Sequence, residues 1–293
     1  MFLDREATVE KAVALIREAA AAGAEVIGFP EGFVPGHPGW VELLPPDERA
    51  LELSKRLFQN AVEVPSEATE ALGEACAEGG IAAVVGICER RPRTTGTLFN
   101  AQLFIDRAGN VGEKHQKFVP TVGERLVHGP GTTGSVNSLA LDGEVTVSGL
   151  ICGENSNPLA QYATAKAYPT VHVASWPQHF SPELRMGPVI EMVSRALAYS
   201  LKVFVINAVT TIGPEMLEAY GDERTTPFLN SDEARGRASI IAPSGEVVAE
   251  ADGFGEQLVF ADVDPSEVIV PKFVHDTAGH YNRPELFRHL FDE

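Results

Sequence analysis

Residues 25–31 read Glu-Val-Ile-Gly-Phe-Pro-Glu, an apolar run that a proline stops directly before an acidic side chain. A short apolar run with such a boundary is typical of a strand buried on both faces. A second run of this kind, residues 145–151, ends directly on Cys152. Two buried strands that end on reactive side chains favour an α/β fold, in which functional groups commonly follow strand ends.

Helical and extended patterns alternate along the rest of the chain. Apolar residues three and four apart predict a helix over residues 6–22, which ends at Gly23. The same criteria predict helices over 66–78, 157–168 and 182–200, and strands over 81–87, 97–106, 113–118, 171–175, 203–209, 239–242, 245–250 and 257–263. Because no repeat or long linker interrupts the alternation, we predict one α/β domain over residues 1–293, with helices covering sheet faces.

The charge of the chain argues against two classes of partner. Acidic residues outnumber basic ones 41 to 23, which gives a formal net charge of −18. Such a surface repels phosphate backbones and anionic lipid headgroups, so we expect no nucleic-acid and no membrane partner. No run approaches the length of a membrane span, and the first residues lack the apolar core of a secretory signal.

The chain has three cysteines, Cys76, Cys88 and Cys152. An odd and sparse set does not form a disulfide framework and fits a reducing compartment, so we expect a cytoplasmic protein. Cys76 falls on a predicted helix and Cys88 in an apolar run, and both are expected in the core. Cys152, at a strand end, is the candidate nucleophile.

Three reactive side chains, Glu31, Lys117 and Cys152, follow predicted strands. A thiol with an ordinary pKa of about 8.5 needs a base or a positive charge nearby to act as a nucleophile. Glu31 offers the base, and Lys117 offers the charge that favours the thiolate and stabilises a developing anion. Each residue also has a purely structural alternative: a helix cap or ion pair for Glu31, a solvated lysine for Lys117, and a core side chain for Cys152.

Two other patterns are weaker. Residues 129–134 match G-x-G-x-x-G, but the stretch that follows looks extended, whereas a dinucleotide site needs a helix there, so we interpret this segment as a loop. The eight histidines are scattered and include no His-x-x-x-His pair, so no metal site is predicted. His115, beside Lys117, and His179, after Trp176, remain candidates for a pocket wall.

Four segments of the sequence resemble the nitrilase branch of the carbon–nitrogen hydrolase superfamily. They are Phe29-Pro-Glu-Gly-Phe-Val-Pro-Gly-His-Pro-Gly-Trp40; Lys114-His-Gln-Lys-Phe-Val-Pro-Thr121 with Glu124-Arg-Leu-Val127; Gly149-Leu-Ile-Cys-Gly-Glu-Asn155 with Asn157-Pro-Leu-Ala160; and Gly279-His-Tyr-Asn-Arg-Pro284. Their order and spacing agree with the family over nearly the whole chain.

The resemblance implies a four-layer α-β-β-α sandwich and a nitrilase that converts an organic nitrile into a carboxylic acid and ammonia. It implies Cys152 as nucleophile, Glu31 as general base and Lys117 as stabiliser of the tetrahedral intermediate, with Glu124 as a supporting second glutamate. The Gly153 backbone N–H is a candidate oxyanion donor. The chemistry passes through a thioimidate and a thioester and needs no metal or organic cofactor.

The resemblance also implies a substrate pocket and a homo-oligomer. Independently of the resemblance, Trp176 and His179 are predicted to bind the substrate, because aromatic side chains shape apolar pockets; core packing for Trp176 and an ordinary hydrogen-bonded role for His179 are the alternatives. His128 stands where the family often has tryptophan, and Gly153 where a bulkier residue is common, so both are expected to widen or repolarise the pocket mouth. The family commonly forms dimers that stack into spirals.

One part of the family fold has no counterpart here. Family members normally begin with a strand before the segment that resembles Phe2–Thr8, so we expect the first inner strand to be missing and stability to be reduced. Three alternatives stay open: an amidase of the same superfamily, a cyanide-hydrating enzyme, and a catalytically silent oligomeric scaffold.

Overall fold

The computed structural model describes residues 2–134, 137–141 and 145–291, and it contains two β-sheets. The spatial order of the first sheet is β1 (Val26–Gly28), β2 (Ala82–Arg90), β3 (Leu98–Ile105) and β4 (Val111–Gln116). The order of the second is β10 (Val247–Glu250), β9 (Ser239–Ile241), β8 (Phe204–Val209), β7 (Val171–Trp176), β6 (Thr146–Ile151) and β5 (Ser138–Ala140). Both sheets mix parallel and antiparallel pairs.

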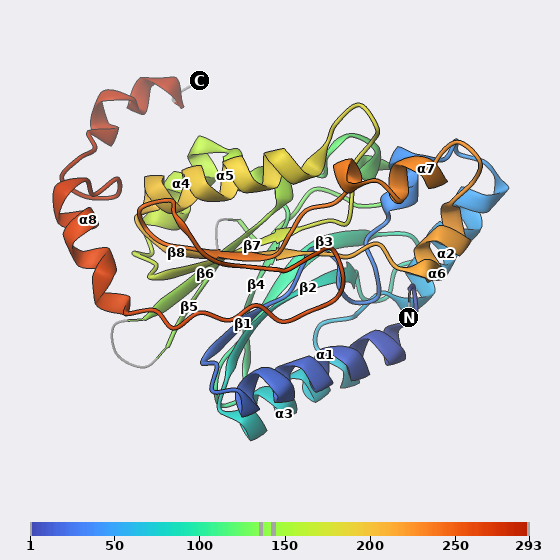
Figure 1. Ribbon diagram of the computed structural model, residues 1–293, viewed down its shortest axis with the longest axis horizontal. Helices are drawn as coiled ribbons and strands as arrows, with labels where there is room; N and C mark the ends of the chain where they lie inside the picture. The colour runs from blue at the N-terminus through green and yellow to red at the C-terminus, as the bar shows by residue number, and fades with distance from the viewer. Residues whose placement is uncertain (1, 135–136, 142–144, 292–293) are drawn as a thin grey trace.

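Helices cover the outer face of each sheet (Figure 1). The first sheet carries α1 (Arg5–Ala21) and α3 (Glu67–Gly79), and the second carries α4 (Pro158–Ala165) and α5 (Met186–Leu201). At one end of the layers lie α2 (Glu48–Asn60), α6 (Pro214–Tyr220) and α7 (Thr226–Leu229), and α8 (Ile269–Val274) lies at the other. The four-layer α-β-β-α sandwich is therefore confirmed.

The two sheets face each other across an apolar layer. Val84 and Phe104 of the first sheet pack with Val173 and Phe204 of the second, and all four are buried. The sheets approach so closely at β1 that a Cβ added to Gly28 would lie 2.7 Å from a methyl of Val173. Glycine is therefore required here, and this close approach holds the end of β1 against the second sheet.

Most of the predicted elements are present, and the predicted strand over residues 257–263 is wrong. These residues are in neither a helix nor a strand. Their side-chain pattern suits a strand, but a strand also needs a neighbour with which to exchange backbone hydrogen bonds, and no described segment supplies one here. In the described part of the chain, no strand precedes α1.

Two further features bear on the sequence predictions. The glycine-rich stretch that matches G-x-G-x-x-G forms a loop, as predicted, and the extended segment expected after it begins at residues 135–136, outside the described residues. Among the helices that the structure describes, none is long and apolar enough to cross a membrane.

Candidate active site

Four buried side chains meet in one cluster, three from segments that follow strands and one from a short helix. Glu31 follows β1, Lys117 directly follows β4, and Cys152 directly follows β6. Glu124 lies in a short 3-10 helix, Val122–Leu126. All four predicted catalytic residues are buried, so the fold brings side chains that are far apart in the sequence together in a place shielded from water.

Lys117 links the two carboxylates. Its Nζ donates to Glu31 Oε1 at 2.8 Å and to Glu124 Oε2 at 2.6 Å. Asn100, in β3, bridges the same pair, because its Nδ2 lies 2.6 Å from Glu31 Oε1 and 2.7 Å from Glu124 Oε1. Two negative charges thus share one cation and one amide, and such paired burial is the condition under which charges persist away from water.

The network keeps these groups ionised. Burial raises the pKa of Glu31, but the Lys117 ammonium and His37 oppose it, and the pKa ends below the ordinary value. Burial raises the pKa of Glu124 too, but Lys117 and His128 outweigh it, so the pKa falls well below the ordinary range. Lys117 moves the other way: burial lowers its pKa, and the charges of Glu31, Cys152 and Glu124 raise it well above the ordinary value.

Cys152 occupies a strained turn between β6 and the 3-10 helix Cys152–Ser156. Its φ is +51°, in the left-handed region that a cysteine rarely adopts. Glu154 holds this turn against the lysine segment: its Oε2 accepts the Ile151 N–H at 3.0 Å and contacts His115 Nε2 at 2.8 Å, and its Oε1 accepts the Phe118 N–H at 2.6 Å. The thiol therefore sits on a turn that one buried carboxylate ties to the strand carrying Lys117.

The Cys152 thiol is protonated at neutral pH in this arrangement. Burial raises its pKa, and the charge of Glu31 raises it further, while Lys117 and the Gly153 backbone N–H only partly oppose this. Glu31 Oε2 is buried and has no hydrogen-bond partner among the described residues. The site therefore holds a neutral thiol beside a carboxylate that has one free oxygen, which is the combination that general-base activation requires.

The four predicted substrate-binding residues lie in different surroundings. Gly153 is exposed directly beside the nucleophile. Trp176 is buried in the apolar cluster that includes Cys152. His179 is buried, and its Nε2 lies 2.9 Å from the Tyr220 hydroxyl. His128 is buried as well and contacts Glu124 Oε1 at 3.0 Å and Cys88 Sγ at 3.2 Å.

These positions change the interpretation of two histidines. His128 is buried against Glu124 and Cys88, a geometry in which it can hold the Glu124 carboxylate in place. His115, a candidate pocket wall, instead pairs with Glu154. Burial lowers the pKa of His179 to about 4, so this imidazole is neutral at pH 7. The Cys76 and Cys88 side chains are in the core, as predicted.

Sequence reasoning missed three polar residues of the site. Asn100 bridges the carboxylates, His37 Nε2 lies 3.6 Å from Glu31 Oε1, and Glu154 ties the nucleophile turn. Glu154 had a signal in the sequence, as an acidic residue two positions after Cys152. Asn100 lies in β3 together with a second buried amide, Gln102, and the sequence does not indicate which of the two reaches the carboxylates.

Glu31, His37 and Glu124 also place one potential metal-ligand atom each within 4.8 Å of one another. The Lys117 ammonium, bonded to both carboxylates, already supplies the positive charge at this point. A divalent cation would have to displace or lie against that ammonium, so these residues do not fit a metal ion.

Comparison with known proteins identifies the family of the chain. The carbon-nitrogen hydrolase family profile matches residues 1–270. The chain is 32% identical over 295 residues to "Nitrilase 2" from an unknown prokaryotic organism, covering 100% of this chain and 89% of that protein. It is 31% identical to an arylacetonitrilase of Aspergillus niger, with 98% and 87% covered, and 31% identical to an aliphatic nitrilase of Rhodococcus rhodochrous, with 100% and 80% covered.

Solved structures share the fold at lower identity. An amidase from Nesterenkonia sp. AN1 superposes with a TM-score of 0.69 at 18% identity, covering 99% of this chain and 96% of that one. Nit3 of Saccharomyces cerevisiae, a member of the nitrilase superfamily, gives 0.69 at 19% identity, covering 92% and 89%. With the family profile over nine-tenths of its length and relatives above 30% identity over all of it, the chain belongs to the carbon-nitrogen hydrolase family.

Proposed function

We propose that the chain is a nitrilase that hydrolyses an organic nitrile to a carboxylic acid and ammonia. The observation that carries this proposal is the placement of a protonated thiol, Cys152, beside the ionised Glu31 and Lys117 in a buried site. The relatives named as an arylacetonitrilase and an aliphatic nitrilase support the substrate class.

The first half of the reaction uses Glu31 as a base. Its carboxylate takes the Cys152 proton as sulfur adds to the nitrile carbon, and that proton passes to the nitrogen to give a thioimidate. Glu31 then takes a proton from a water that adds to the same carbon. Lys117 and the Gly153 N–H stabilise the charge of the tetrahedral species.

The second half releases both products. Glu31 returns its proton to the nitrogen, and the hydroxyl of the tetrahedral species gives up a second proton to that nitrogen as the carbonyl forms. The carbon–nitrogen bond then breaks, ammonia leaves, and a thioester remains on Cys152. A second water, deprotonated by Glu31, adds to the thioester carbon, and the carbon–sulfur bond breaks to free the acid and restore the thiol. Two waters are consumed for each nitrile. Glu124 supports the reaction by holding Lys117 in place.

The test is turnover of matched substrates. The purified chain and Cys152→Ala would be incubated with aliphatic, arylaliphatic and aromatic nitriles and the corresponding amides, and ammonia and acid would both be quantified. Equal amounts of ammonia and acid from nitriles, lost in the variant, are expected. Ammonia from amides alone would identify an amidase, and ammonia release that persists in Cys152→Ala would reject the proposed nucleophile.

Three further properties belong to this proposal. We propose that residues 1–293 work as one domain in the cytoplasm, since the three cysteines are free and Cys152 must stay reduced.

We also propose a homo-oligomer. Large apolar side chains are exposed on α5 (Val189, Met192, Tyr199) and over residues 269–291, which supports burial of these surfaces by another copy. Light scattering after size exclusion tests the oligomer, and a monomeric mass would reject it.

A further inference from the structure

A second thiol lies close to the catalytic network, although the reaction described above does not use it. Cys88, in β2, is buried, and its Sγ lies 3.2 Å from His128 Nε2. The other ring nitrogen of His128, Nδ1, lies 3.0 Å from Glu124 Oε1. A thiol, an imidazole and a carboxylate thus follow one another within hydrogen-bonding distance, and the series ends on the residue that holds Lys117.

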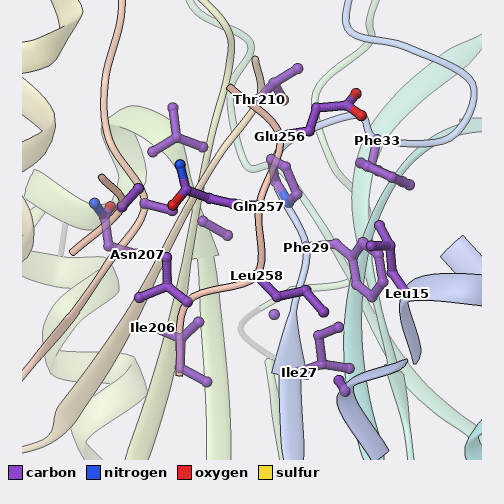
Figure 2. Close-up of a pocket in the computed structure, with 18 of the residues that line it drawn as sticks. Leu15, Ile27, Phe29, Phe33, Ile206, Asn207, Thr210, Glu256, Gln257 and Leu258 are labelled. Carbon is purple, nitrogen blue, oxygen red and sulfur yellow. The ribbon is translucent and has the colours of Figure 1, made fainter. Parts of the chain in front are cut away.

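The surroundings of Cys88 argue against a role as a second nucleophile. Its side chain is 1% exposed, and burial together with the charges of Glu124 and Glu89 raises its pKa well above the ordinary value, so the thiol keeps its proton. A groove of about 1240 Å³ lies between β1 and residues 257–263 (Figure 2), but the described residues that line it include neither Cys88 nor His128. A ligand in that groove would not touch the thiol, which is free to donate its S–H to a neighbouring side chain.

Four hydrogen bonds hold the Glu124 carboxylate. Asn100 Nδ2 lies 2.7 Å from Oε1, and His128 Nδ1 lies 3.0 Å from the same oxygen. Lys117 Nζ donates to Oε2 at 2.6 Å, and the Thr121 N–H donates to it at 2.9 Å. An ionised carboxylate has about four lone-pair sites, so these donors fix its orientation and, with it, the position of the Lys117 ammonium.

The tautomer of His128 decides whether its bond to Glu124 exists. An ionised carboxylate can only accept, so Nδ1 must carry a proton to bond to it. In a neutral imidazole Nε2 is then the acceptor, and the Cys88 S–H faces it at 3.2 Å. The opposite tautomer would set the lone pair of Nδ1 against the carboxylate. Donation from the thiol therefore favours the tautomer that holds Glu124.

The pairing of β2 with β3 places Cys88 and Asn100 beside each other. The two residues are direct cross-strand partners, so their side chains leave the sheet on the same face. Asn100 reaches Glu124 directly, whereas Cys88 reaches it through His128. The His128 backbone is fixed as well, since its N–H donates to Glu124 O at 2.9 Å. One pair of strands thus supports both donors to Glu124 Oε1.

We propose that Cys88 is a positioning residue for the nitrile reaction, because its S–H fixes the His128 tautomer that donates to Glu124. Glu124 in turn holds Lys117, which stabilises the tetrahedral species. This inference rests on the proposed function, since the position of Lys117 affects turnover only if the site carries out that reaction. Cys88 itself forms no bond to the substrate, so its replacement should change kcat and leave KM unchanged.

The test compares two replacements that separate hydrogen bonding from packing. Cys88→Val fills the space of the thiol but donates no hydrogen bond, and Cys88→Ser donates one but fills less of the space. We expect kcat to fall about 3- to 10-fold in Cys88→Val, the effect of one lost hydrogen bond, and to fall less in Cys88→Ser. Cys76→Val, at a buried thiol in the apolar cluster of the first sheet, is the control and should keep its kcat.

Removing the imidazole tests whether Cys88 acts through it. In a His128→Phe background a ring remains but no nitrogen accepts the thiol, so Cys88→Val and Cys88→Ser should have equal kcat. A Cys88→Val enzyme that matches or exceeds Cys88→Ser in the wild-type background would indicate a packing role and overturn the proposal. A difference between the two that persists beside His128→Phe would overturn it as well.

An infrared measurement tests the hydrogen bond without turnover. The S–H stretching band of Cys88 is the band that Cys88→Val loses, and it should move to higher frequency in His128→Phe, because a donating S–H bond is weakened by its acceptor. An unchanged band would overturn the proposal even if the chain hydrolyses nitriles. Because this measurement needs no substrate, failure of the nitrilase proposal, seen as absent turnover by the wild-type chain, is distinguished from failure of this one.

Discussion

At the scale of single residues, the site depends on which groups carry charge at neutral pH. The two carboxylates of Glu31 and Glu124 are ionised because they share the Lys117 ammonium, while Cys152 keeps its proton. A thiol that stays protonated cannot accumulate as a free thiolate in the resting site. We therefore infer that the proton moves to Glu31 as substrate is attacked, rather than before.

Replacing the base tests this role. In Glu31→Gln the amide keeps the shape but cannot take the thiol proton, so kcat should fall by about 10³-fold at every pH. A thermal midpoint measured in parallel separates chemistry from folding, since the change also leaves Lys117 with one carboxylate fewer. Retention of more than a tenth of the wild-type kcat would show that another group is the base.

Asn100 provides a prediction about pH. Asn100→Asp places a third carboxylate where an amide now donates to Glu31 and Glu124. A like charge raises the pKa of Glu31, and a base is lost as the pH falls through its pKa. The acid limb of the kcat/KM profile should therefore move to higher pH. Loss of activity without movement of that limb would indicate a merely structural role.

Removing the contact between His128 and Glu124 should slow the reaction without changing substrate binding. Its Nδ1 lies 3.0 Å from Glu124 Oε1, and its Nε2 lies 3.2 Å from Cys88 Sγ. His128→Gln should lower kcat by roughly 10- to 100-fold, the range expected for a lost hydrogen bond to a charged group, with little change in KM. A change confined to KM would restore the earlier interpretation of His128 as a substrate-binding residue.

At the scale of elements, two of the site residues could be predicted from the sequence because they follow short apolar strands. β1 and β6 are short apolar runs, and each leads into a reactive residue, so Glu31 and Cys152 could be predicted from local pattern. Asn100 could not, because its role depends on the register of β3 against β2 and β4. Register is a property of strand pairs, and no single stretch of sequence contains it.

Over residues 257–263 the local sequence pattern predicts a strand that the structure does not form. Its apolar pattern is that of a strand, but its conformation depends on a neighbour that the pattern cannot reveal. Helix α2 was not predicted, although Asp47 accepts the Ala50 N–H at 3.1 Å as an N-cap and Leu53 and Leu57 form its buried face.

The turn that carries Cys152 depends on a single side chain, Glu154, and should be sensitive to its replacement. Glu154→Ala removes the acceptor for two backbone N–H groups and the partner of His115. Such a change should lower the free energy of unfolding by about 2–4 kcal/mol and reduce kcat, because the turn positions the thiol. Denaturant unfolding measures the first effect, and Glu154→Gln, which retains one acceptor, should show a smaller loss.

At the scale of the whole molecule, buried histidines make stability depend on pH. Burial lowers the pKa of His172 to about 3 and that of His179 to about 4, from an ordinary 6.5. The unfolded chain therefore takes up these protons first. Stability is fully present above about pH 6.5 and falls as the pH drops toward 4, by about 1.4 kcal/mol per pH unit for each histidine.

Denaturant unfolding between pH 7 and 4 measures this dependence. His172 is held by Ser148 and by Asn155, whose amide also donates to the Cys152 carbonyl, and His172→Gln removes one titrating group. The variant should be less stable at pH 7 but show a shallower loss in acid. An unchanged slope would mean that other groups control the acid limb.

The central claim is that Cys152 bonds covalently to a nitrile carbon. The most direct measurement is peptide mass spectrometry of the enzyme quenched in acid during turnover of a slow nitrile. We predict an acyl or imidoyl adduct on the peptide that contains Cys152, absent in Cys152→Ala and absent from the peptides of Cys76 and Cys88. Turnover with no adduct on Cys152, together with full ammonia release by Cys152→Ala, would contradict the account.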